Sequence, residues 1–536
     1  MALEDDNICY FKGGDLEELL RIVSSPPLGT LVVDLCERTI QRSPTSSTFG
    51  PIADFIISRH GLVLRNGTLH LGDRRLSVLQ VPVHVSRTSS RRSSLDSGYS
   101  FASSKRSVDI SSTAVTLGLL SVDHNARQLP NEALFNVEGS TTRPRNNHRN
   151  RRLSSISDSS SYKSKCIKFQ NVKICGDSNL LNADRGLLVV KGGHLFMDNC
   201  QVCFSASEPA QHNLSVGAQD STSQTPSAAA AAVEVRQGGV LNMSACQISF
   251  QEGSGLRVSG LGSVASLCMC TLESSLGPSI EALDGANLRI ADSMLKGSLQ
   301  GPGLHAQGSG TRVSAKACRV MGCKGQGVLV RKAARCELLA CSVLGGCGTG
   351  VEIQGTKSRL TMYDTVIRGC LEGGLSIKDG AWAHVEGADI ELNQGGPCVH
   401  VIGCGSTVSL SSCILVTSAH SGLHIEEGGY AEIKDSTIDC HNHTQEMSTQ
   451  AVRRGILETE MSCASHPPIT VTGVRSMLLL GEEVEVCCGD HVQERLMVCD
   501  GGQVQGQLLD VPVSSSSQEC DPPTVVDKKA SDLKSS

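Results

Sequence analysis

A pattern of about 24 residues recurs between residues 186 and 445 of this 536-residue chain. One outline is shared by the segments GLHAQGSGTRVSAKACRVMGC (303–323), GLSIKDGAWAHVEGADIEL (374–392) and GLHIEEGGYAEIKDSTIDC (422–440). The repeats start at small residues, namely Gly186, Ala232, Gly255, Ser279, Gly303, Gly327, Gly350, Gly374, Cys398 and Gly422. From residue 232 onward neighbouring starts are 23 or 24 residues apart. A fixed period of this length is typical of solenoids, in which stacked repeats bury one continuous core.

Each repeat opens with an alternation of aliphatic and other residues. The second residue is aliphatic and the fourth is aliphatic or Ala in every copy, as with Leu187 and Val189, or Val328 and Val330. Residues two apart on a strand share a face, so the alternation predicts short strands with one buried face. Strands of neighbouring repeats are expected to pair in parallel, about 4.8 Å apart.

A small residue followed two positions later by an aliphatic one marks the second half of each repeat. The small residue is often cysteine, at Cys200, Cys246, Cys270, Cys318, Cys341 and Cys413. A second column holds Cys323, Cys347 and Cys370. Stacked thiolates can hold zinc, but these three lack C-x-x-C spacing, and Cys is a common small interior residue. Interior packing is the interpretation kept, and no cofactor is predicted.

At this point the repeats resemble the right-handed parallel β-helix of the pectin-lyase-like superfamily. The resemblance implies an all-β solenoid of roughly twelve turns with an N-terminal capping helix, in which Asp15 precedes the helix as its N-cap. The predicted divisions are a cap with first turns at 1–85, a Ser/Arg-rich and largely disordered insert at 86–165, the β-helix at 166–445 with a loop insert at 206–228, a β-rich C-terminal cap at 446–513 and a disordered tail at 514–536.

Many members of this superfamily act on acidic polysaccharides and carry recognisable catalytic motifs. The N-T-D, G-H-G and R-I-K signatures are absent, and the only Asp-Asp pair is Asp5-Asp6, outside the repeats. Faint likenesses of lyase motifs, Ser121-Val122-Asp123-His124 and Arg143-Pro144-Arg145, fall in the insert. No catalytic residue is therefore predicted.

The third and fifth residues of each repeat are expected to point away from the core and form a polar stripe. Its candidate binding residues are Glu234, Arg257, Glu281, His305, Arg331, Glu352, Lys378, His400, His424 and Glu426. One interpretation is a solvated sheet face with charges paired across strands. The other is a docking surface for a peptide, glycan or partner protein. Two His and a carboxylate are also a metal-ligand set, but no metal is predicted.

The charge distribution separates an acidic body from a basic insert. The whole chain carries a net charge of −6, while residues 86–165 hold 13 Lys/Arg against 6 Asp/Glu. A nucleic-acid partner is not expected. Ser93, Ser94 and Ser154 follow Arg pairs and are candidate phosphorylation sites. The insert is either a solubilising linker or a cover for the stripe that phosphorylation releases.

No secretory signal and no apolar run long enough to span a membrane are seen, which predicts a cytoplasmic protein. The chain is also similar to the β-helix region shared by certain F-box substrate-recognition proteins and spindle-associated adaptor proteins. That similarity favours a non-catalytic intracellular scaffold that binds a protein or glycan along its strand face. The alternative is a divergent carbohydrate-acting protein, a polysaccharide lyase or glycoside hydrolase.

Overall fold

The computed structural model of the chain describes a defined set of stretches. They are residues 8–11, 13–24, 30–41, 55–57, 61–71, 76–79, 166–177, 187–205, 231–251, 253–298, 300–391, 393–417, 420–440, 467–488, 495–506 and 513–514. The predicted insert at 86–165, the loop at 206–228, most of the tail at 514–536 and the candidates Ser93, Ser94 and Ser154 lie outside them.

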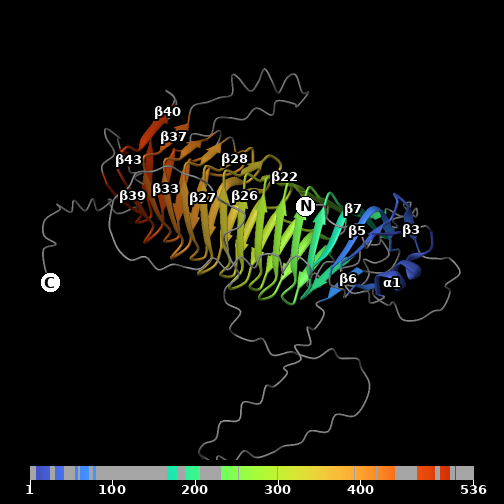
Figure 1. Cartoon of the computed structure of the whole chain (residues 1–536). Coiled ribbons are helices and arrows are strands. Elements are labelled where there is room, and N and C mark those ends of the chain that lie inside the picture. Colours follow the sequence, from blue (N-terminus) through green and yellow to red (C-terminus); the bar gives the residue numbers. More distant parts are fainter. Residues whose placement is uncertain are drawn as a thin grey trace, which may run out of the picture. The chain divides into compact units, whose positions relative to one another are not determined.

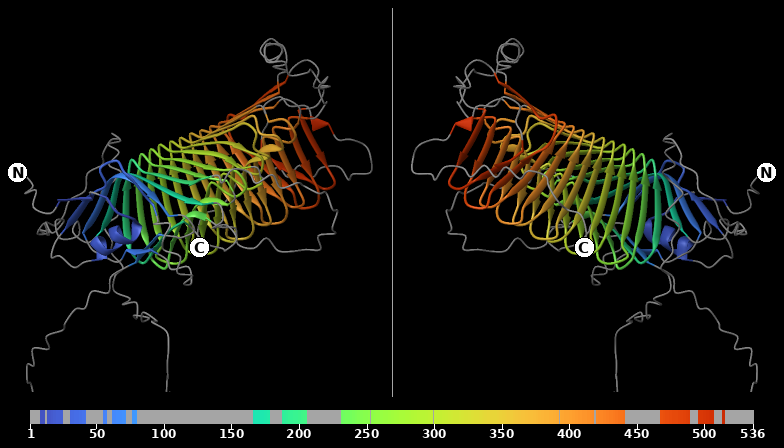
Figure 2. Two further views of the ribbon diagram at one scale, coloured as in Figure 1. Left: turned by 90° about the vertical axis from the view of Figure 1, so that its right-hand side faces the viewer. Right: turned by 90° about the vertical axis from the view of Figure 1, so that its left-hand side faces the viewer.

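The described chain is a parallel β-solenoid of about 13 turns, close to the number expected. Its strands form one sheet of 15 strands and one sheet of 28. Within each sheet, neighbouring strands pair in parallel. Figures 1 and 2 show the strands stacked in chain order, from blue through green and yellow to red. Each repeat supplies one strand to the first sheet and two to the second.

The 15-stranded sheet carries the start of each repeat. Its strands are β4 (Phe55–Ile57), β6 (Leu76–Leu79), β8 (Leu188–Lys191), β11 (Ala231–Arg236), β14 (Ser254–Ser259), β17 (Ile280–Leu283), β20 (Leu304–Gln307), β23 (Val328–Arg331), β26 (Thr349–Gln354), β29 (Gly373–Lys378), β32 (Val399–Ile402), β35 (Leu423–Glu426), β38 (Ile469–Thr472), β41 (Leu496–Cys499) and β43 (Val513–Ser514).

The 28-stranded sheet consists of two rows that meet at a bend. The first row is β1 (Ile8–Tyr10), β2 (Leu31–Asp34), β5 (Leu62–His70), β7 (Ile167–Asp177), β9 (His194–Asp198), β12 (Val240–Ser244), β15 (Val264–Cys268), β18 (Asn287–Ala291), β21 (Arg312–Lys316), β24 (Arg335–Leu339), β27 (Arg359–Tyr363), β30 (Trp382–Glu386), β33 (Thr407–Ser411), β36 (Tyr430–Lys434), β39 (Met477–Leu480) and β42 (Gln503–Gln505). The second row is β3 (Thr39–Gln41), β10 (Gln201–Ser205), β13 (Gln247–Phe250), β16 (Thr271–Ser274), β19 (Met294–Ser298), β22 (Arg319–Cys323), β25 (Ser342–Leu344), β28 (Val366–Arg368), β31 (Asp389–Glu391), β34 (Ile414–Val416), β37 (Thr437–Cys440) and β40 (Glu485–Cys488). Strands β5 and β7 run through the bend and belong to both rows.

The bend depends on a residue with left-handed backbone conformation in each turn. Asn66, Asn171 and Asn199 have φ near 57°, 52° and 50°. Asparagine tolerates this region better than most residues. Their side chains also stack, since Asn199 Nδ2 donates to Asn171 Oδ1 at 2.8 Å and Asn171 Nδ2 donates to Asn66 Oδ1 at 3.0 Å. These hydrogen bonds stabilise the bend across the three turns that carry Asn66, Asn171 and Asn199.

The predicted helix is present as α1 (Leu16–Ser24). The backbone N–H of Glu18 donates to Asp15 Oδ1 at 3.0 Å, which confirms Asp15 as the N-cap. Leu16, Leu19 and Val23 are buried and join the core of the first turns.

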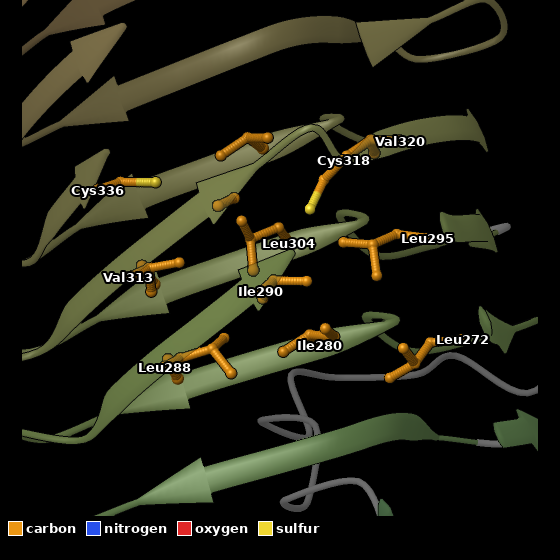
Figure 3. Close-up of a cluster of buried hydrophobic side chains, with 14 of the residues drawn as sticks. Leu272, Ile280, Leu288, Ile290, Leu295, Leu304, Val313, Cys318, Val320 and Cys336 are labelled. Carbon is orange, nitrogen blue, oxygen red and sulfur yellow. The ribbon is translucent and has the colours of Figure 1, made fainter. Parts of the chain in front are cut away.

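The core consists of columns of aliphatic side chains that repeat from turn to turn. Figure 3 shows Ile280 and Leu304 of the 15-stranded sheet facing side chains from both rows of the other sheet. The predicted inward positions from residue 232 onward are buried, including Val328 and Val330. The six predicted interior cysteines, with Cys318 among those in Figure 3, are buried as well.

One register prediction was wrong. Leu188 and Val190, rather than Leu187 and Val189, pair with Val233 and Val235 of the next turn. All four residues from 187 to 190 are buried. A strand without a polar residue at its outward positions gives no alternation, so its register cannot be read from the pattern.

The segment at 446–513, predicted as a β-rich cap, supplies further strands to the same sheets. Ile469 of β38 pairs with Leu423 of β35, and Leu478 of β39 pairs with Ala431 of β36. In the described part of the chain, no helix has the length and apolar character needed to cross a membrane.

Candidate functional site

The predicted stripe is a continuous column on the outer face of the 15-stranded sheet. Strand pairing places in register Glu234, Arg257, Glu281, His305, Leu329, Glu352, Ser376, His400 and His424, which we call the strand-face ladder. Arg331, Lys378 and Glu426 lie two residues further along their strands, on the same face. The structure therefore brings all ten predicted binding residues onto one face.

The centre of the ladder is not exposed, which corrects the expectation of a solvated stripe. His305 is 5% exposed and Glu352 is 9% exposed, and Leu329 and Ser376 are buried too. Neighbouring strands lie only about 4.8 Å apart, so side chains in register shield one another, and charge pairs hold them against the sheet.

Glu281 is the centre of the first charged cluster. Its Oε2 accepts hydrogen bonds from Arg257 Nε at 2.8 Å and Ser254 Oγ at 2.9 Å, and its Oε1 lies 3.4 Å from His305 Nδ1. Burial raises the pKa of this carboxyl, but the His305 hydrogen bond and the Arg257 charge outweigh burial and lower the pKa to about 2. Glu281 is therefore ionised at neutral pH. The Nε2 atom of His305 is buried and has no hydrogen-bond partner among the residues that the structure describes.

The other carboxylates of this face also have cationic neighbours. Lys378 Nζ donates to Glu352 Oε2 at 3.1 Å, and Arg236 Nη1 lies 3.3 Å from Glu234 Oε1. Arg331 differs, because its Nε donates to the amide oxygen of Gln307 at 2.7 Å.

His400, His424 and Glu426 form a separate cluster on the same face. The two imidazole rings stack with centroids 4.9 Å apart, and His400 Nε2 lies 2.9 Å from Glu426 Oε1. His424 Nε2 lies 3.8 Å from Glu426 Oε2. Burial and the neighbouring His424 lower the pKa of His400, and they outweigh the opposing effect of Glu426. One ligand atom from each of the three side chains lies within 4.8 Å of the others.

A second outward column was missed by sequence reasoning. Arg312, Arg335 and Arg359 open β21, β24 and β27 and are in register, followed by Trp382 of β30. All four are exposed, and we call them the basic ladder. Exposed Lys332 and Lys357 lie in the turns that lead into these strands.

The aromatic end of the basic ladder is organised by stacking. The Arg359 guanidinium carbon lies 5.9 Å from the Trp382 ring centroid, within the range of a cation–π contact. The His384 ring is nearly parallel to the Trp382 ring, at 13° and 6.1 Å. Trp382 is still 39% exposed.

The signal for this column was present in the sequence. Arg312, Arg335, Arg359 and Trp382 are 23, 24 and 23 residues apart. The turns that lead into the strands, QGSGTR and RKAAR, differ in length by one residue. When the repeats are aligned on their first residues, the arginines therefore fall at different positions.

Comparisons with known proteins agree with the strand pairing. The family model described as a right handed beta helix region matches residues 231–400. The parallel coils and this match show that the chain is a right-handed parallel β-helix protein. No curated protein matches it.

Solved structures with a similar chain course include a phage tailspike and two bacterial epimerase modules. Tailspike protein 3 of bacteriophage CBA120 is 9% identical with a TM-score of 0.41, covering 96% of this chain and 62% of its own. The A-module of Azotobacter vinelandii mannuronan C-5 epimerase AlgE6 is 9% identical with a TM-score of 0.30, covering 65% of this chain and 88% of its own. The AlgE4 A-module is 9% identical with a TM-score of 0.28, covering 66% and 90%.

Proposed function

We propose that this protein is a non-catalytic scaffold that binds an acidic segment of a partner protein on the basic ladder. The observation that carries the proposal is the register of three exposed arginines, Arg312, Arg335 and Arg359, on adjacent strands. Among the described residues, no carboxylate forms an ion pair with Arg312 or Arg335. An acidic ligand would supply the missing negative charge.

The arrangement is unfavourable without such a ligand. Like charges directly opposite one another on adjacent strands destabilise a sheet. Arg335 has an arginine on both sides. Guanidinium groups bind carboxylates in a bidentate manner, and Arg and Trp are enriched among the residues that dominate protein interfaces. Trp382 at the end of the ladder adds an apolar contact beside the charges.

The strand-face ladder fits this role less well than the sequence suggested. Its charges are already paired with one another, and its central side chains are buried. Of the ten predicted binding residues, Arg331 remains in the proposal, because it ends a strand whose turn leads into the basic ladder. The cytoplasmic location stays a prediction.

The pairing of the carboxylates also supports binding without turnover. Glycoside hydrolysis needs two carboxyl groups in separate acid and base roles. On this face Glu234, Glu281, Glu352 and Glu426 each lie against a cationic or imidazole group. Glu281, with its pKa near 2, is a poor proton donor at neutral pH.

An acidic polysaccharide is the second candidate ligand. One positive charge per strand, about 4.8 Å apart, suits an extended chain with one acid group on each sugar. The exposed Trp382 ring could lie against a sugar ring.

Binding to poly-L-glutamate tests the proposal, with polygalacturonate as the glycan probe. The wild-type protein should bind immobilised poly-L-glutamate, and the triple variant Arg312→Glu, Arg335→Glu, Arg359→Glu should bind at least about tenfold more weakly, or 1.4 kcal/mol. The matched control reverses three exposed charges of the second row and its turn, Lys296→Glu, Arg319→Glu and Lys324→Glu.

The outcomes separate the candidates. Equal weakening by both triple variants would reduce the effect to net charge and contradict the proposal. Selective binding of polygalacturonate would favour the glycan ligand instead. Release of new chain ends from polygalacturonate by the protein would contradict a non-catalytic role.

A further inference from the structure

Two imidazoles and a carboxylate converge at one point on the outer face of the 15-stranded sheet. His400 and His424 are register partners on β32 and β35, and Glu426 lies two residues after His424 on the same face. The parallel pairing thus brings together two residues that are 24 apart in the sequence.

The three side chains lie near the separation that a metal ion requires. Two ligands of a tetrahedral zinc ion lie roughly 3.4 Å apart, given metal–ligand bonds of about 2.0–2.1 Å. His400 Nε2 lies 2.9 Å from Glu426 Oε1, and His424 Nε2 lies 3.8 Å from Glu426 Oε2. One ligand atom from each group lies within 4.8 Å of the others, so small side-chain rotations reach the required geometry.

We propose that His400, His424 and Glu426 bind a divalent transition-metal ion, with zinc as the probe ion. Two imidazoles favour zinc and its first-row neighbours over calcium or magnesium, which prefer oxygen ligands. Two His and one Glu are also a ligand set in which zinc keeps a fourth position open.

The three side chains are partly exposed. An ion can therefore reach them, and solvent can reach the fourth coordination position. The side chains of His400, His424 and Glu426 are 24%, 28% and 31% exposed. The cation Lys378 acts on His400 across this face, and Glu352 holds its ammonium at 3.1 Å. Solvent, or a ligand atom of a partner, would complete the coordination.

The chain contains a matched control site. His384 and Glu386 have the same two-residue spacing, and His384 Nε2 lies 3.8 Å from Glu386 Oε2. The register partners of His384 are Thr361 and Ser409, so this site lacks a second imidazole. His384→Asn therefore removes a surface His–Glu pair without touching the proposed ligands.

Calorimetric titration of the full chain with zinc tests the proposal. Accessible thiols are first alkylated with iodoacetamide, because cysteine thiolates also bind zinc. The wild type and His384→Asn should each bind one zinc ion per chain, while His424→Asn and Glu426→Gln should lose that ion. Zinc should also raise the melting temperature of the two binding proteins only.

X-ray absorption of the zinc-loaded protein identifies the ligands. A coordination shell of nitrogen and oxygen is expected. Sulfur in the shell, no binding by the wild type, or equal binding by His424→Asn and Glu426→Gln would each overturn the site. Circular dichroism of the variants checks that any loss of binding does not come from unfolding.

Discussion

Arg335 of β24 lies in register between Arg312 and Arg359, so its guanidinium has a like charge on each side. Parallel pairing holds the strands about 4.8 Å apart, so the three side chains leave the sheet at neighbouring points on one face. A solenoid of this kind can stack identical side chains along its surface, and here it stacks three exposed cations beside Trp382.

The inward columns predict where a charge is not tolerated. Val330 is buried between its register partners Ala306 and Ile353. Val330→Asp places a carboxyl there without a partner, which costs several kcal/mol at about the scale of an unpaired buried polar group. Urea unfolding should show a large loss of stability or an insoluble chain. The exposed control Lys357→Ala should change the free energy of unfolding by less than about 0.5 kcal/mol. An unchanged unfolding curve for Val330→Asp would contradict the register.

The lowered pKa of Glu281 predicts a specific pH dependence of stability. Its pKa is about 2 in the folded chain, against an ordinary value of 4.5, so the ionised form stabilises the fold above about pH 4.5. That contribution, roughly 3 kcal/mol, is lost as the pH falls toward 2. The free energy of unfolding of wild type minus that of Glu281→Gln should therefore decrease between pH 5 and pH 2. A difference that stays constant over this range would show that the Glu281 cluster does not hold the carboxylate ionised.

Thiol burial predicts an order of labelling. Cys36 and Cys404 are exposed, whereas burial raises the pKa of Cys336 and of Cys413. The thiolate is the reactive form, so the two buried thiols should resist iodoacetamide until the chain unfolds. Peptide mass spectrometry after brief native labelling should find Cys36 and Cys404 modified. Rapid native modification of Cys413 would contradict the interior column of cysteines.

Most of the fold could be predicted from the sequence because the inward side is specified twice in each repeat. Val328 and Val330 alternate with outward residues, and this pattern recurs with little change from residue 232 to residue 425. The prediction failed at Leu187–Val190, where four apolar residues in succession leave the register open.

The candidate site was less predictable because the outward side follows no such rule. The sequence placed His305 and Glu352 on the outward face correctly, but their burial depends on neighbours in adjacent turns. The column of Arg312, Arg335 and Arg359 escaped notice because the turns before these residues differ in length. The structure supplies the register that brings these three arginines together.

Replacement of Arg335 tests the central claim most directly, because stability and binding should change in opposite directions. Arg335→Thr removes the like charge between Arg312 and Arg359, so the free energy of unfolding should rise by about 0.2–1 kcal/mol. The same change should weaken binding to poly-L-glutamate, since a ligand contact is lost. The control Arg319→Thr, between Met294 and Ser342, should do neither. Paired urea-unfolding and binding curves should thus show a more stable Arg335→Thr protein that binds more weakly. A variant that is more stable but binds as well as the wild type would contradict the basic ladder as a binding surface.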